Sequence, residues 1–164
     1  MIDVNEVLND IRKVIDTIVK TREKINDREL NDIYNRYIDH FGMLELYFEG
    51  WKEKDLRSFD IVISRKALIV AIRMMLVEPI RLKTFEFNNE DDFRNLKVGD
   101  IIDQFFNDKN VYQKLLREYY HEVYHLKNEL EHYLESHNAK DLIPLLNLVR
   151  EIKAKLEKHE VKWL

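Results

Sequence analysis

The segment Asn110–His137, NVYQKLLREYYHEVYHLKNELEHYLESH, decides the fold that the sequence predicts. Seven apolar or aromatic residues recur in it at alternating spacings of four and three, which is the spacing that lines one face of a helix. These core-seam residues are Tyr112, Leu116, Tyr119, Val123, Leu126, Leu130 and Tyr133. The segment therefore predicts a long helix, from about residue 110 to 137, with one face in the core.

The rest of the chain favours further helices packed around this one. Its 164 residues include only three Gly and two Pro, and 45% are hydrophobic and 35% charged. This composition is typical of helices joined by short turns, because a many-stranded sandwich needs frequent Gly and Pro turns. Apolar residues at helical spacing run from Asp3, which can cap a helix, to Ile25, and again, after a turn and new cap at Asn26–Asp27, to Trp51.

Two later segments complete the predicted architecture. Phe59–Val77 is apolar almost all round, which predicts a buried helix, although its β-branched residues would also suit a strand pair and an α+β class. A last helix is expected from about 141 to 160, with Asp141 as its cap. We predict an all-α, single-domain bundle of five or six helices over residues 1–164, in which the long helix is antiparallel to the last one.

Charge and cysteine content disfavour several functional classes. The net charge is −4 and the pI is near 5.9, which disfavours a general nucleic-acid binder. The absence of cysteine excludes disulfides, thiolate metal sites and cysteine nucleophiles. Met1–Val4 lacks a basic leader, and three cations interrupt the longest apolar run, so we predict a cytoplasmic protein. The Lys- and Glu-rich usage indicates a thermophilic source or AT-rich coding.

The sequence HEVYH, His121–His125, is the only motif here that indicates a particular chemistry. The spacing of four places the imidazoles of His121 and His125 one above the other on a helix, within reach of one divalent ion such as zinc. Glu122 would then act as a base on a metal-bound water, whose pKa the ion lowers. Together with Glu118, Glu129 and His132, these residues form a polar stripe beside the core seam.

HEVYH resembles the consensus of the zincin metalloproteases, and the resemblance implies a metal-dependent hydrolase. The match covers five residues. The glycine and histidine that follow in metzincins are Asn128 and Glu131 here, so that extension is absent. In the gluzincin version a glutamate on the following helix completes the site, and Glu151 is the candidate.

A third imidazole, His40 on the second predicted helix, leads to another metal hypothesis. With His121 and His125 it resembles, in number and order, the three histidines that hold a divalent ion in DinB-like helical bundles. His40 or Glu151 is therefore the candidate third ligand.

A polar stripe beside a core seam is more often a solvated flank that makes contacts within its own helix. We therefore expect first a small intracellular bundle that acts by binding a protein partner or itself, with Tyr120 and Tyr124 as a partner surface. A metal-binding bundle is the alternative. A weaker alternative is a nucleic-acid-associated small subunit that uses the basic cluster between Arg65 and Lys83.

Overall fold

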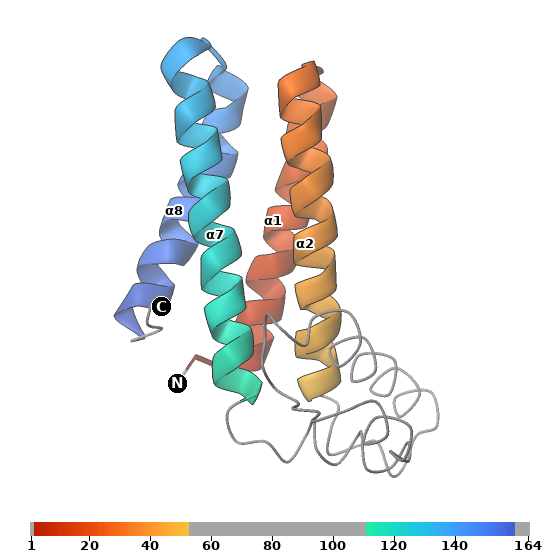
Figure 1. The fold of residues 1–164 in the computed structure, drawn as a ribbon, viewed down its shortest axis with the longest axis vertical. Coiled ribbons are helices and arrows are strands. Elements are labelled where there is room, and N and C mark those ends of the chain that lie inside the picture. Colours follow the sequence, from red (N-terminus) through yellow and green to blue (C-terminus); the bar gives the residue numbers. More distant parts are fainter. Residues whose placement is uncertain (1, 53–110, 160–164) are drawn as a thin grey trace, which may run out of the picture. The chain divides into compact units, whose positions relative to one another are not determined.

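The computed structural model describes residues 2–52 and 111–159, and every regular element in them is helical. The elements are α1 (Val4–Lys24), α2 (Arg28–Lys52), α7 (Val111–Ser136), the 3-10 turn η2 (Lys140–Leu142) and α8 (Ile143–Lys158) (Figure 1). The described helices pack as a bundle, so the all-α prediction is confirmed for this part of the chain. The segment 59–77 lies outside the described residues, and the total of five or six helices stays a prediction.

The contacts divide the chain into two compact units. One unit combines Met1–Glu45 with Leu116–Leu164, and the other is Leu46–Leu115. In the second unit the ring of Tyr112 stacks on Trp51 with centroids 5.6 Å apart and meets Phe48 edge to face at 6.0 Å. The prediction of a single domain stays a prediction.

The helix ends follow local capping rules in most places. The Asp3 carboxylate accepts a hydrogen bond from the Asn5 N–H at 2.6 Å, and the Asp27 carboxylate accepts one from the Leu30 N–H at 3.3 Å, so both predicted caps are confirmed. The last helix differs from its prediction. Asp141 lies in η2 and α8 begins at Ile143, because the short 3-10 turn takes up the residues before Pro144.

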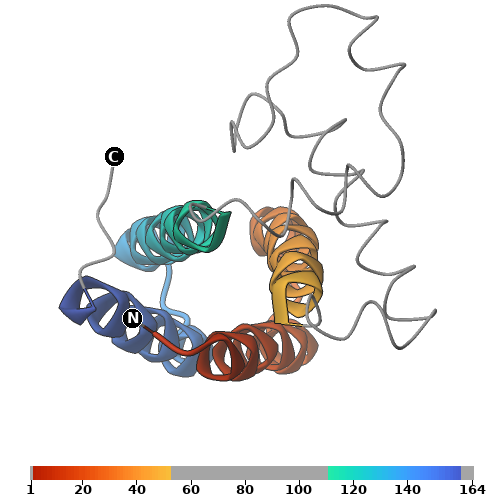
Figure 2. The same ribbon diagram turned by 90° about the horizontal axis from the view of Figure 1, so that it is seen from below.

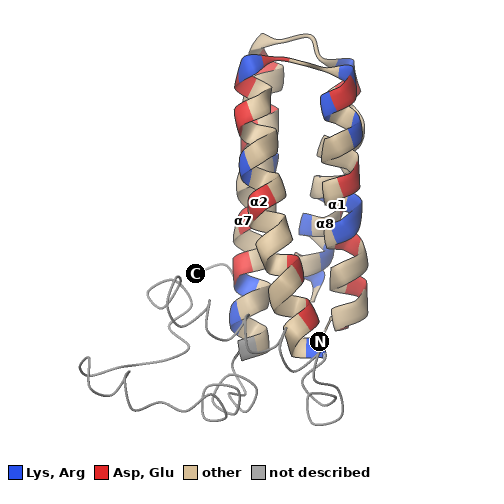
Figure 3. Ribbon diagram, turned by 90° about the vertical axis from the view of Figure 1, so that its right-hand side faces the viewer, with Lys and Arg blue, Asp and Glu red and all other residues tan. Residues whose placement is uncertain are grey.

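In the first unit, each helix lies antiparallel to its two neighbours around a ring of four. Figure 2 shows this ring end-on, with α1 between α8 and α2, and α7 between α2 and α8. An ion pair joins each two neighbouring helices. These pairs are Arg12–Glu45 between α1 and α2, Arg36–Glu129 between α2 and α7, Arg150–Glu131 between α8 and α7, and Lys155–Asp10 between α8 and α1. The predicted antiparallel pairing of the long helix with the last helix is therefore present. Acidic and basic residues are interspersed along the helices (Figure 3).

The core seam of α7 is buried as predicted. Its seven residues are at most 6% exposed, from Tyr112 at one end to Tyr133 at the other. Tyr120 was expected outside the core, as part of a partner surface, but it is only 5% exposed. It is buried because α8 covers this side of α7, and the carboxylate of Glu157 on α8 accepts a hydrogen bond from the Tyr120 hydroxyl at 2.6 Å. Among the described helices, none has the length and apolar character that a membrane span requires.

Candidate functional site

Part of the polar stripe of α7 faces α2. Glu122 is one of three buried polar residues in the described part of the chain, and its Oε2 lies 2.8 Å from Nδ1 of His40 on α2. The ring of Tyr37 meets His40 edge-on, with centroids 5.7 Å apart. Two of the predicted site residues, His40 and Glu122, are thus brought together from two helices.

A second contact of the same kind lies two turns further along α7. Arg36 donates a hydrogen bond to Oε1 of Glu129 at 2.6 Å, and its guanidinium lies 5.5 Å from the centroid of the Tyr37 ring. This hydrogen bond raises the pKa of Arg36, and burial, followed by the hydrogen bond with Glu129, raises the pKa of Tyr37. Two carboxylates of the stripe, Glu122 and Glu129, therefore join α7 to α2.

The two imidazoles of HEVYH lie at the more exposed edge of the same stripe. The rings of His121 and His125 lie 6.3 Å apart and are tilted by 36°, so the spacing of four makes them neighbours as expected. His125 is exposed and His121 is partly exposed, whereas Glu122 between them is buried. His132, further along the stripe, is exposed and pairs locally with Glu135 at 3.5 Å.

The predicted third ligands do not gather around this pair. His40 contacts Glu122, and Glu151 is an exposed residue of α8. Within residues 2–52 and 111–159, no three His, Asp or Glu side chains converge in an arrangement that would hold a metal ion. His40 and Glu122 supply an imidazole and a carboxylate at one point, and Glu122 is the carboxylate that was expected to act as a base.

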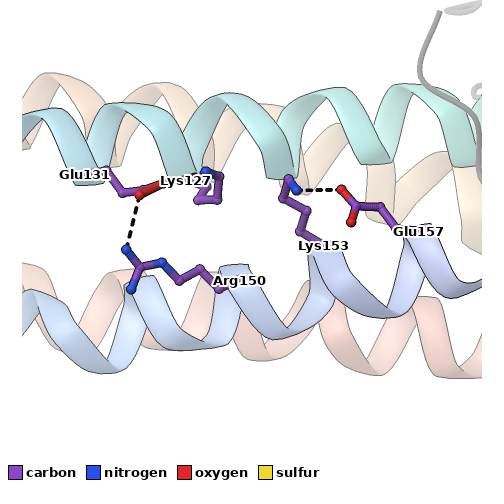
Figure 4. A network of polar contacts seen from close by, with 5 residues as sticks. All are labelled: Lys127, Glu131, Arg150, Lys153 and Glu157. Atoms are coloured by element: carbon purple, nitrogen blue, oxygen red, sulfur yellow. Dashed lines mark hydrogen bonds and ion pairs between the residues drawn. The ribbon is translucent and has the colours of Figure 1, made fainter.

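The seam between α7 and α8 contains a network of charged side chains (Figure 4). Glu131 accepts hydrogen bonds from Lys127 and Arg150, and Glu157 accepts one from Lys153. These bonds lower the pKa of both carboxyl groups, mainly through Lys127 for Glu131 and through Lys153 for Glu157. All five side chains have a partner inside the seam, which indicates that this network stabilises the hairpin of α7 and α8.

Tyr124 lies beside this network and was expected to mark a partner surface. Its ring stacks on Tyr120 with centroids 6.4 Å apart, and the ammonium groups of Lys127 and Lys153 each lie 5.9 Å from its centroid. Cations at this distance from a tyrosine ring are attracted by its π-system. Tyr124 is therefore partly covered by its own chain.

The outer face of α8 has a feature that the sequence reasoning missed. Among the described residues, the exposed apolar side chains are Ile143, Pro144 and Ala154, and all three belong to α8. Ile143, which is 42% exposed, is the large hydrophobic side chain among these three residues. The signal was present in the sequence, because these residues lie outside the buried stripe of α8.

No known protein family, no curated protein and no solved structure matches this chain. The basic cluster between Arg65 and Lys83 lies outside the described residues, so the nucleic-acid alternative stays a prediction.

Alkaline pH is expected to unfold the bundle. Burial raises the pKa of Tyr34 and of Tyr120 to about 12, and it raises the pKa of Tyr119 well above its usual value. An unfolded tyrosine ionises near pH 10, so the stabilisation is fully present below about pH 10 and is lost as the pH rises toward about 12. Each such tyrosine changes the free energy of unfolding by about 1.4 kcal/mol per pH unit in this window.

Tyrosinate absorbance recorded together with circular dichroism measures this effect. The absorbance of the buried tyrosines is expected to rise in the same step in which helicity is lost, and Tyr34→Phe is expected to make the loss less steep. A tyrosinate signal that appears in full near pH 10 while the helices stay intact would contradict the expectation.

Proposed function

We propose that this protein is an intracellular interaction module that binds a protein partner, or a second copy of itself, through the outer face of α8. The observation that carries the proposal is the location of Ile143, Pro144 and Ala154, the exposed apolar residues of the described chain, on this one helix. The exposed residues of α1, α2 and α7 are polar or charged.

The centre of a protein interface is depleted in charged residues relative to the rest of the surface, whereas isolated apolar residues scattered over a surface are ordinary. The three residues are not scattered, because they share one helix that is 16 residues long. Asn147, a neutral exposed residue, extends the uncharged exposed stretch that Ile143 and Pro144 begin at the N-terminal end of α8. This contrast with the other helices favours α8 as the contact face.

A photo-activated cross-linker placed at Ile143 tests the proposal. We expect a discrete covalent adduct from position 143 and little or none from Asn9, a matched control that is exposed on α1. In a separate variant without the cross-linker, Ile143→Glu is expected to weaken binding about tenfold or more, since it puts a charge at the centre of the contact. Equal adducts from both positions, or none from position 143, would count against the proposal.

A divalent-metal protein, with hydrolysis as its activity, is the second candidate. It is favoured by the contact between His40 Nδ1 and Glu122 Oε2 at 2.8 Å, because this contact brings the candidate third ligand next to the candidate base of HEVYH. His121 and His125 remain the proposed ligand pair of the HEVYH motif, with His40 or Glu151 as the proposed third ligand and Glu122 as the proposed base.

Elemental analysis of protein purified without a histidine tag, and its melting temperature with and without Zn²⁺, test this candidate. A metal site that uses the HEVYH pair predicts bound metal and a higher melting temperature in the natural chain, and the loss of both in His121→Ala/His125→Ala. His132→Ala, on the same helix and exposed, is the control. The absence of both bound metal and a metal-dependent gain would eliminate the candidate.

A further inference from the structure

We infer that His121 and His125 form a two-histidine clamp on the surface of α7, which binds a late first-row divalent ion of the Cu²⁺ or Ni²⁺ kind. The clamp rests on the second candidate function, because it uses the same imidazole pair. It differs in the ion that it selects, and it needs neither a third protein ligand nor a base for hydrolysis.

The two imidazoles stand on adjacent turns of one helix. Their ring centroids lie 6.3 Å apart, and the ring planes are tilted by 36°. An ion bound by both rings lies about 2 Å from each nitrogen, so the two nitrogens must approach to about 3 Å. Side chains four residues apart on a helix are neighbours, so rotation about their side-chain bonds closes this gap while the backbone stays in place.

The bundle fixes the helical segment that presents the two rings. Between them, Glu122 is 5% exposed with its Oε2 2.8 Å from Nδ1 of His40, and Val123 is fully buried. The ring of Tyr124 meets that of His125 edge to face, with centroids 5.8 Å apart. Because the backbone is already ordered, binding an ion costs little conformational entropy.

The clamp is accessible from solvent. His125 is exposed and His121 is partly exposed, so an ion reaches them without any opening of the bundle. In the part of the chain that the structure describes, no third His, Asp or Glu converges with this pair on a metal position. Two protein ligands leave the other coordination positions to water or to a donor atom of another molecule.

A pair of imidazoles favours some ions over others. Structural zinc sites use four protein ligands, and catalytic zinc sites use three. Cu²⁺ and Ni²⁺ accept tetragonal sets of nitrogen and oxygen ligands, in which water can take the remaining positions. Among the first-row divalent ions, Cu²⁺ also binds a given set of such ligands most strongly. We therefore expect the clamp to bind Cu²⁺ more tightly than Zn²⁺.

Electron paramagnetic resonance of the untagged chain with equimolar Cu²⁺ tests the clamp, with glycine present to remove loosely bound copper. We expect a spectrum with two imidazole nitrogens on the ion. His121→Ala and His125→Ala are each expected to lower the affinity for Cu²⁺ at least about tenfold. The matched control is His132→Ala/His137→Ala, which removes two other exposed imidazoles and is expected to keep the spectrum.

Two results would overturn the clamp. A spectrum that is unchanged in His121→Ala/His125→Ala would show adventitious copper only. A third imidazole nitrogen that disappears in His40→Ala would show a three-ligand site in place of the clamp.

Melting temperature gives an independent readout, because an ion that binds only the folded chain stabilises it. Ni²⁺ is expected to raise the melting temperature of the natural chain and of the control, and to leave that of His121→Ala/His125→Ala unchanged. Circular dichroism without metal shows whether each variant folds, and an equal gain in all three chains would overturn the clamp. If the chain binds Cu²⁺ through two nitrogens but carries no zinc and gains nothing from Zn²⁺, the hydrolase candidate fails while the clamp stands.

Discussion

Phe41→Ala is expected to lower the free energy of unfolding by about 3–5 kcal/mol. Phe41 is fully buried on α2, and its ring meets that of Tyr119 on α7 edge to face, with centroids 6.3 Å apart. Alanine removes the buried ring and leaves a cavity between two helices, which adds to the lost transfer free energy. Urea unfolding followed by circular dichroism measures the change.

Ile38→Ala is the matched control, because Ile38 lies one turn earlier on the same helix and is only partly buried. Its cost is expected to be clearly smaller than that of Phe41→Ala. If the two variants lost the same stability, or Phe41→Ala lost less than about 1 kcal/mol, the packing of α2 against α7 through Phe41 would be wrong.

Lys155→Met is expected to lower the free energy of unfolding by about 1–3 kcal/mol. The Lys155 ammonium lies 2.8 Å from Asp10 Oδ2 and 3.1 Å from Glu6 Oε1, and Asp10 is only 6% exposed. The hydrogen bond with Asp10 raises the pKa of Lys155. Removing the cation leaves a buried carboxylate without this charge partner, which is costly at low local dielectric.

The double variant Asp10→Leu/Lys155→Met is expected to recover most of the loss, because apolar residues of similar size remove the buried charge altogether. Lys158→Met, at an exposed position of the same helix, is expected to change stability by less than about 0.5 kcal/mol. Losses that simply add in the double variant would show that Asp10 and Lys155 do not interact across the seam.

The helices that the structure describes were predictable because their sequence signals are local. The alternating spacing from Tyr112 to Tyr133 predicts one buried face whatever the neighbours are, and Asp3 and Asp27 cap their own helices. Asp141 was less predictable. A side chain suited to capping does not decide between an α-helical start and a 3-10 turn, and the turn moved the helix start to Ile143.

The flanks of α7 could not be predicted from its periodicity, because the pattern of one helix does not say which neighbour packs on either side. Tyr120 is buried because α8 covers it, and Glu122 is buried because α2 presents His40 to it. The spacing of HEVYH correctly makes His121 and His125 neighbours. Which neighbouring helix Glu122 meets depends on the order of the helices around the ring, and the motif contains no information on that order.

The seam closed by Lys155 and Asp10 has a consequence for how the chain folds. These residues are 145 positions apart, whereas α1 with α2, and α7 with α8, are hairpins with short turns. Closing a loop of that length costs about 4 kcal/mol of chain entropy more than a contact between adjacent residues. We therefore expect the two hairpins to form early and the first and last helices to join late. Kinetically, mutations at Asp10 and Lys155 should then act mainly on the unfolding rate.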